Sequence, residues 1–139
     1  MTGQSNIRDY AIEQMNLLLT RLAFQVHRAA QMPGPDEVHD VRVSIRRFSQ
    51  GLLIFADLLP PAEVKKIRKR LKGMMQVTSQ IRNRDIALEF LIQKKHTAHL
   101  ARFRKERADY QRQFLDLARR WSARDFSAKW RNRLLLESR

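Results

Sequence analysis

The sequence of 139 residues contains no cysteine and only four glycines and four prolines. Without cysteine the chain forms neither a disulfide framework nor a thiolate metal site, and it suits a reducing compartment. No apolar run approaches the roughly 20 residues that span a bilayer, and the N-terminus lacks the basic-then-apolar pattern of a secretory signal. We therefore expect a cytoplasmic protein with no membrane partner.

Acidic residues are scarce as well, with 14 Asp and Glu against 28 Lys and Arg, which gives a net charge of +14. This excess predicts a polyanionic partner, and charge alone does not choose among polyphosphate, nucleic acid and an anionic membrane surface. Residues 42–105 hold sixteen basic and four acidic residues, whereas residues 1–41 hold three and five. The middle of the chain is therefore the expected binding region.

Apolar residues recur at helical spacing and no strand-like alternation stands out, so the sequence predicts an all-α fold. We expect one domain over residues 1–139, an antiparallel bundle of about four to five helices. The expected helices cover residues 5–31, 36–59, 61–78 and 85–95, with a last long helix from 98 that is either continuous to 134 or kinked near Ser122. Ser5 and Asp36 are the expected N-caps. Apolar residues expected in the core include Ile7, Met15, Val38, Ile45, Phe48, Leu71, Ile86, Ile92, Phe114 and Trp121.

The segment Val38-His-Asp-Val-Arg-Val-Ser-Ile-Arg-Arg-Phe48 places basic side chains beside an apolar face. His39, Arg42 and Arg46 fall within an arc of about 60° on a helix. Arg42 and Arg46 lie roughly 6 Å apart along the axis, a spacing that suits a linear anion with repeated charges. The alternatives are a capping or packing histidine, and arginines that are solvated or paired with Asp40 and Asp57.

A second basic stripe on the following helix consists of Lys65, Arg68, Lys69 and Lys72. Two such stripes on neighbouring helices predict the two walls of a groove. Neither stripe contains an aromatic residue for base stacking, although Tyr110, Trp121 and Trp130 lie elsewhere in the chain. The stripes therefore favour a linear polyanion that has no bases. Binding of RNA or DNA is the alternative function, and nucleic acid is expected to bind more weakly than such a polyanion.

The motif Val-His-x-x-Arg-Val-x-x-Arg-Arg-Phe, followed by Ile81-Arg-Asn-Arg-Asp-Ile86, resembles the N-terminal half of a CHAD domain, the conserved histidine α-helical domain. The resemblance implies an all-helical fold and non-catalytic binding of inorganic polyphosphate along a basic channel. It also implies an association with polyphosphate granules. The expected polyphosphate-binding residues are His39, Arg42, Arg46, Arg47, Lys65, Arg68, Lys69, Lys72, Arg82 and Arg84.

The sequence departs from this family pattern at three positions. Asn83 stands where the family usually has aspartate, which leaves Asp85 alone to orient Arg82 and Arg84. Ser49 and Leu53 stand where family members often carry Arg or Lys, so we expect the groove to be less charged on that side. The family's full domain resembles two bundles related by a pseudo-two-fold, and this chain covers about half. We expect a homodimer that rebuilds a two-bundle channel, and the alternative is a single bundle that binds more weakly on an open face.

The sequence contains little that indicates catalysis. It has no Gly-rich phosphate loop, no Gly-x-Ser-x-Gly and no nucleophile beside an obvious base. His96 and His99 form an i, i+3 pair, but no carboxylate recurs with them as it does in di-metal helical bundles. We therefore expect no enzyme activity, no cofactor and no metal.

Overall fold

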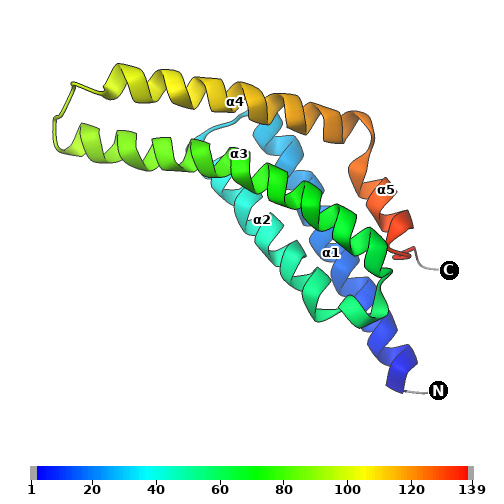
Figure 1. The fold of residues 1–139 in the computed structure, drawn as a ribbon. Helices are drawn as coiled ribbons and strands as arrows, with labels where there is room; N and C mark the ends of the chain where they lie inside the picture. The colour runs from blue at the N-terminus through cyan, green and yellow to red at the C-terminus, as the bar shows by residue number, and fades with distance from the viewer. Residues whose placement is uncertain (1–2, 138–139) are drawn as a thin grey trace.

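The computed structural model describes residues 3–137, and within them the chain forms five α-helices, one short 3-10 helix and no strand (Figure 1). The all-α prediction is confirmed. The elements are α1 (Gly3–Gln31), α2 (Pro35–Ile54), η1 (Ala56–Leu58), α3 (Pro61–Gln93), α4 (Leu100–Ala123) and α5 (Phe126–Arg133). Helices α1, α2 and the first part of α3 pack side by side, and α4 runs back along α3 to bring α5 against α1 (Figure 1).

The helix starts differ from those predicted. Helix α1 already begins at Gly3, so Ser5 lies within its first turn and is not the N-cap. Helix α2 is capped by Gly34 with Pro35 in the first turn, so the prediction of Asp36 as the cap is wrong. Proline supplies a helical φ and lacks an N–H that would need a partner, and the carboxylate of Asp36 still faces the positive end of the helix dipole.

Helix α3 continues through Ser79, where the sequence predicted a break. Thr78 is fully buried, and its hydroxyl donates to the carbonyl of Met74 at 2.8 Å. Ile81 then continues the buried side of the helix without interruption. The polar residues that interrupt the apolar pattern are thus accommodated inside the bundle, and the predicted helices 61–78 and 85–95 are one element.

The core is formed where all five helices meet, and it ends in an aromatic cluster at the junction of α4 and α5. Trp121, Phe126 and Trp130 lie with ring centroids 5.0–5.2 Å apart, and Phe48 of α2 stacks on Trp130. The chain turns between the two helices at Asp125, which has a φ of 46°. The last helix is therefore kinked near Ser122, the second of the two predicted arrangements.

Three residues predicted for the core are exposed instead. Ile7 is 56% exposed near the start of α1, and Ile86 and Ile92 are 51% and 56% exposed near the end of α3. The α3–α4 hairpin continues beyond the turn between α1 and α2, so no third helix of the described chain covers its end (Figure 1). An apolar residue at helical spacing becomes a core residue only where another element packs on it.

Candidate anion-binding site

A hollow of about 720 Å³ lies between α2 and α3. Its α3 wall is strongly basic, whereas α2 contributes Ile45 and Ser49. Ser49, one of the positions where family members often carry Arg or Lys, lies on the α2 wall of this hollow. The α3 residues that line the hollow are Lys65, Lys66, Arg68, Lys69, Leu71, Lys72 and Met75.

The buried side of α3 fixes the orientation of its basic wall. Val64, Ile67 and Leu71 are buried in the bundle at helical spacing, which directs Lys65, Arg68, Lys69 and Lys72 outward. These four side chains make no ion pair with any described residue, whereas Lys66 contacts Glu63 at 3.7 Å. Sequence reasoning missed Lys66 because it lies about 100° from Lys65 around the helix.

Arg42 joins α2 to α3. Its Nη1 donates to the carbonyl of Met75 at 3.0 Å and to the hydroxyls of Thr78 and Ser79 at 3.2 and 2.7 Å. Burial lowers the pKa of Arg42 from its ordinary value, and the nearby charges of Arg46 and Arg82 lower it further. Arg42 is therefore held in place by the fold while part of its guanidinium faces other positive charges.

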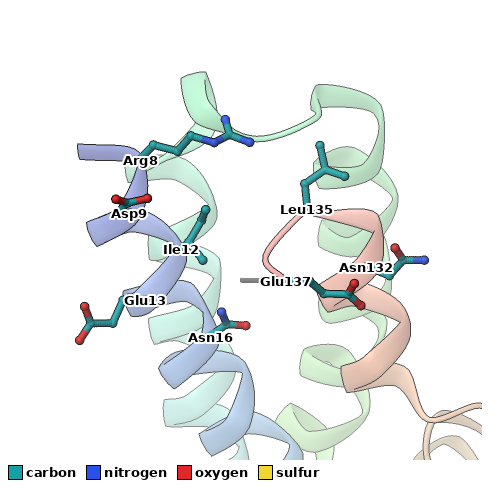
Figure 2. Close-up of a pocket in the computed structure, with 8 residues that line it drawn as sticks. All are labelled: Arg8, Asp9, Ile12, Glu13, Asn16, Asn132, Leu135 and Glu137. Atoms are coloured by element: carbon teal, nitrogen blue, oxygen red, sulfur yellow. The ribbon is translucent and has the colours of Figure 1, made fainter. Parts of the chain in front are cut away.

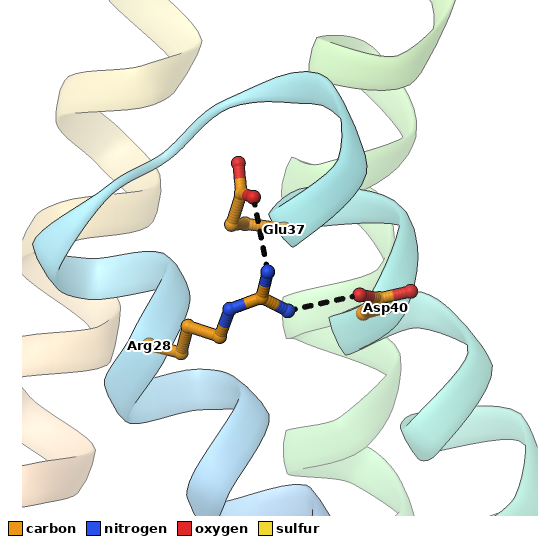
Figure 3. Close-up of polar contacts among 3 residues, drawn as sticks. All are labelled: Arg28, Glu37 and Asp40. Carbon is orange, nitrogen blue, oxygen red and sulfur yellow. Dashed lines mark hydrogen bonds and ion pairs between the residues drawn. The ribbon is translucent and has the colours of Figure 1, made fainter.

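Arg46 and Arg82 bring further positive charge to Arg42 from α2 and α3 respectively. Arg46 is exposed and Arg82 is half-buried, and neither makes an ion pair within the described part of the chain. Asp40 was the alternative partner for the arginines of α2. It instead pairs with Arg28 of α1 at 3.1 Å, in a cluster that also contains Glu37 (Figure 3).

His39 and Arg47 are both exposed on α2. His39 lies one turn before Arg42, so it shares a side of the helix with Arg42 and Arg46. Arg47 is displaced by about 100° from Arg46 and extends the positive charge around the helix. Neither side chain is held by a described ion pair or hydrogen bond.

Arg84 and Asp85 face α4 and are already paired. The Nη2 of Arg84 lies 3.1 Å from Oε1 of Glu106, and its guanidinium covers the ring of Tyr110 at 4.9 Å. Asp85 accepts from Nε of Arg107 at 2.5 Å, so the prediction that it orients Arg82 and Arg84 is wrong. A single sequence cannot indicate this pairing, because Arg107 lies in a different helix.

The family model of the CHAD domain matches residues 17–138, nearly the whole chain. The chain belongs to the CHAD domain family. No curated protein and no solved structure shows a significant match to it. The matched residues include all of α2, α3, α4 and α5. They therefore include every residue that lines the hollow between α2 and α3, and also Arg42, Arg46 and Arg82.

This CHAD domain has a second hollow, of about 1040 Å³, between α1 and the C-terminal turn (Figure 2). Asp9, Glu13 and Glu137 line it together with Arg8, so its charge does not suit a polyanion. Asn16 crosses its floor, donating from Nδ2 to the carbonyl of Leu136 at 2.7 Å. No group of three or more potential metal ligands occurs among residues 3–137.

The helices of this CHAD domain also bear on the question of membranes. None of those described combines the length and the apolar character needed to cross a bilayer.

Proposed function

We propose that this CHAD domain binds inorganic polyphosphate without turning it over, through the outer face of α3 and the adjoining arginines of α2. The observation that carries the proposal is a set of basic side chains of α3 without a described ion pair, which spans about 26 Å of the helix and consists of Lys65, Arg68, Lys69, Lys72 and Arg82. The proposed ligand residues are His39, Arg42, Arg46, Arg47, Lys65, Arg68, Lys69, Lys72 and Arg82. Arg84 is left out because Glu106 already neutralises it.

A linear polyanion suits this arrangement for an electrostatic reason. Burial is the main reason why the pKa of Arg42 is lowered, and the positive charges of Arg46 and Arg82 lower it further because they repel its guanidinium. A phosphate group between them replaces that repulsion with charge-assisted hydrogen bonds. The hydroxyls that hold Arg42 keep its guanidinium in position before the ligand arrives, which lowers the entropy lost on binding.

Binding without turnover is supported by how the acidic residues of this region are used. Hydrolysis of phosphoanhydrides uses carboxylates that hold Mg²⁺-type ions. Between residues 42 and 105 the acids are Asp57, Glu63, Asp85 and Glu89. Glu63 pairs with Lys66 and Asp85 with Arg107, so two of the four are already engaged with cations of the protein.

Nucleic-acid binding is the second candidate. Phe90 favours it, since this ring is 55% exposed on α3 two turns beyond Arg82. Trp121 and Trp130 oppose it, because they are only 4% and 1% exposed and have no free face on which a base can stack. Tyr110 is covered by Arg84. Polyphosphate needs no stacking surface and is therefore the better match.

Competition separates the two candidates. Polyphosphate of matched total charge is expected to displace labelled single-stranded RNA and duplex DNA at about 0.15 M salt, with little displacement in reverse. A salt titration alone does not discriminate, because both ligands release counterions. If RNA prevails and Phe90→Ala weakens its binding, the domain is a nucleic-acid module.

His39 can be tested by substitution. An imidazole N–H can donate a hydrogen bond to a phosphate oxygen. His39→Ala is therefore expected to weaken polyphosphate affinity severalfold, measured by fluorescence anisotropy of a labelled chain. His27, His96 and His99 remain in the variant as an internal control. Unchanged affinity would remove His39 from the site.

A further inference from the structure

The end of the α3–α4 hairpin projects from the bundle. The pair of Asp85 with Arg107, whose Nη2 also donates to the carbonyl of Pro33 at 2.8 Å, ties the hairpin to the turn between α1 and α2. Beyond this level, residues 86–93 continue for about 12 Å with α4 as the only described helix beside them (Figure 1). Ile86 and Phe90 are 51% and 55% exposed there.

The exposed residues continue a side of α3 that is covered closer to its start. Ser79 is contacted by Arg42 of α2, and Ile86 follows seven residues later on the same side of the helix. Phe90 lies one turn further. The hairpin itself is firmly held, because Arg84 and Asp85 both make ion pairs with α4. Ile86 and Phe90 thus form an exposed apolar strip on the folded hairpin, and a further helix packed against this strip would bury it.

The charges beside the strip indicate that the helix packed against it is α3 of a second copy. Arg82 and Glu89 are seven residues apart and therefore lie along the same edge, on either side of Ile86. When two copies of one helix pack antiparallel about a two-fold axis near Ile86, residues of the same edge meet. Arg82 of each copy then faces Glu89 of the other. No ion pair within the described chain engages either side chain.

We propose that residues 82–90 of α3 form the contact between two copies of this chain, which pack antiparallel with Ile86 at the centre and Phe90 one turn away from it. The contact is isologous, as in most homodimers. It is short, so the association is weak and depends on protein concentration. Arg82 is shared with the proposed polyphosphate site, so the tests use phosphate-free buffer, and the contact itself does not rest on polyphosphate binding.

The absence of cysteine provides a direct test. Ile86→Cys introduces a single thiol next to the proposed axis, where it meets its own copy. Mild oxidation is expected to give a covalent dimer at least ten times faster than for Gln113→Cys, which places the thiol at an exposed position of α4. Equal rates for the two variants would overturn the proposal.

A charge exchange tests the pairing itself by sedimentation equilibrium. Arg82→Glu and Glu89→Arg should each weaken dimerisation about tenfold or more, and the double variant should return to within about threefold of the wild type. Circular dichroism checks that each variant remains helical. A monomer at all concentrations, or a double variant no better than the single ones, contradicts the antiparallel contact. The contact is also contradicted if the wild-type protein stays monomeric and binds phosphatidylserine vesicles through Phe90, because the exposed strip would then be a lipid-binding surface.

Discussion

Replacing Arg46, Lys69 and Lys72 together by glutamate is expected to lower polyphosphate affinity at least a hundredfold at about 0.15 M salt. One charge-assisted hydrogen bond contributes about 1.5–3 kcal/mol, and reversal adds repulsion. All three side chains are exposed and hold no described partner, so helical content and thermal stability should change little. Isothermal titration or anisotropy with a labelled chain measures the loss.

The matched control reverses Lys94, Arg104 and Lys105, which are exposed near the end of the hairpin. Each reversal removes two units, so both triple variants fall from a net charge of +14 to +8. Only the groove variant should lose binding if the site is local. Similar losses in the two variants would mean that polyphosphate responds to the overall charge of the domain and not to the groove.

Asp85→Ala is expected to destabilise the fold by about 3–5 kcal/mol, because it leaves the largely buried guanidinium of Arg107 without its carboxylate. The side chains of Asp85 and Arg107 are only 7% and 16% exposed. Asp85→Asn should cost less, since an amide oxygen still accepts from Nε of Arg107. Chemical denaturation followed by circular dichroism gives the free energy of unfolding for both variants.

Two comparisons make this prediction specific. Asp116→Ala breaks the exposed pair with Arg119, whose atoms lie 4.0 Å apart, and should change stability by less than about 1 kcal/mol. Polyphosphate affinity of folded Asp85→Asn should match the wild type, because Asp85 holds Arg107 and not the arginines of the groove. A strong loss of affinity without loss of stability would restore the orienting role that the sequence suggested.

The features that the sequence predicted correctly are those set by local periodicity. Val38, Ile45 and Phe48 are buried as expected because one helix face decides their position, and the same arithmetic directs Lys65 and Lys72 outward. The predicted helix break around Ser79 is wrong because the hydroxyl of Ser79 accepts a hydrogen bond from Arg42 of another helix, and local periodicity does not indicate such a partner.

A single sequence does not indicate which charged residues form ion pairs or which apolar residues are covered by another helix. Asp85 has arginines at positions 82 and 84 close by in sequence, yet it pairs with Arg107, 22 residues away. Ile86 has the spacing of a core residue, but it would be buried only if α1 continued beyond the turn that precedes Pro35. Which charges remain available to a ligand is therefore a tertiary property, decided by the helix that lies opposite each side chain.

The aromatic cluster at the α4–α5 junction determines how this domain can be observed in solution. The chain has two tryptophans, and both belong to that cluster, with ring centroids 5.2 Å apart. Neither lines the groove between α2 and α3. Intrinsic emission therefore follows the melting of the bundle and its closing helix, and stays nearly silent when an anion occupies the groove, so ligand binding needs a label on the anion or on α3.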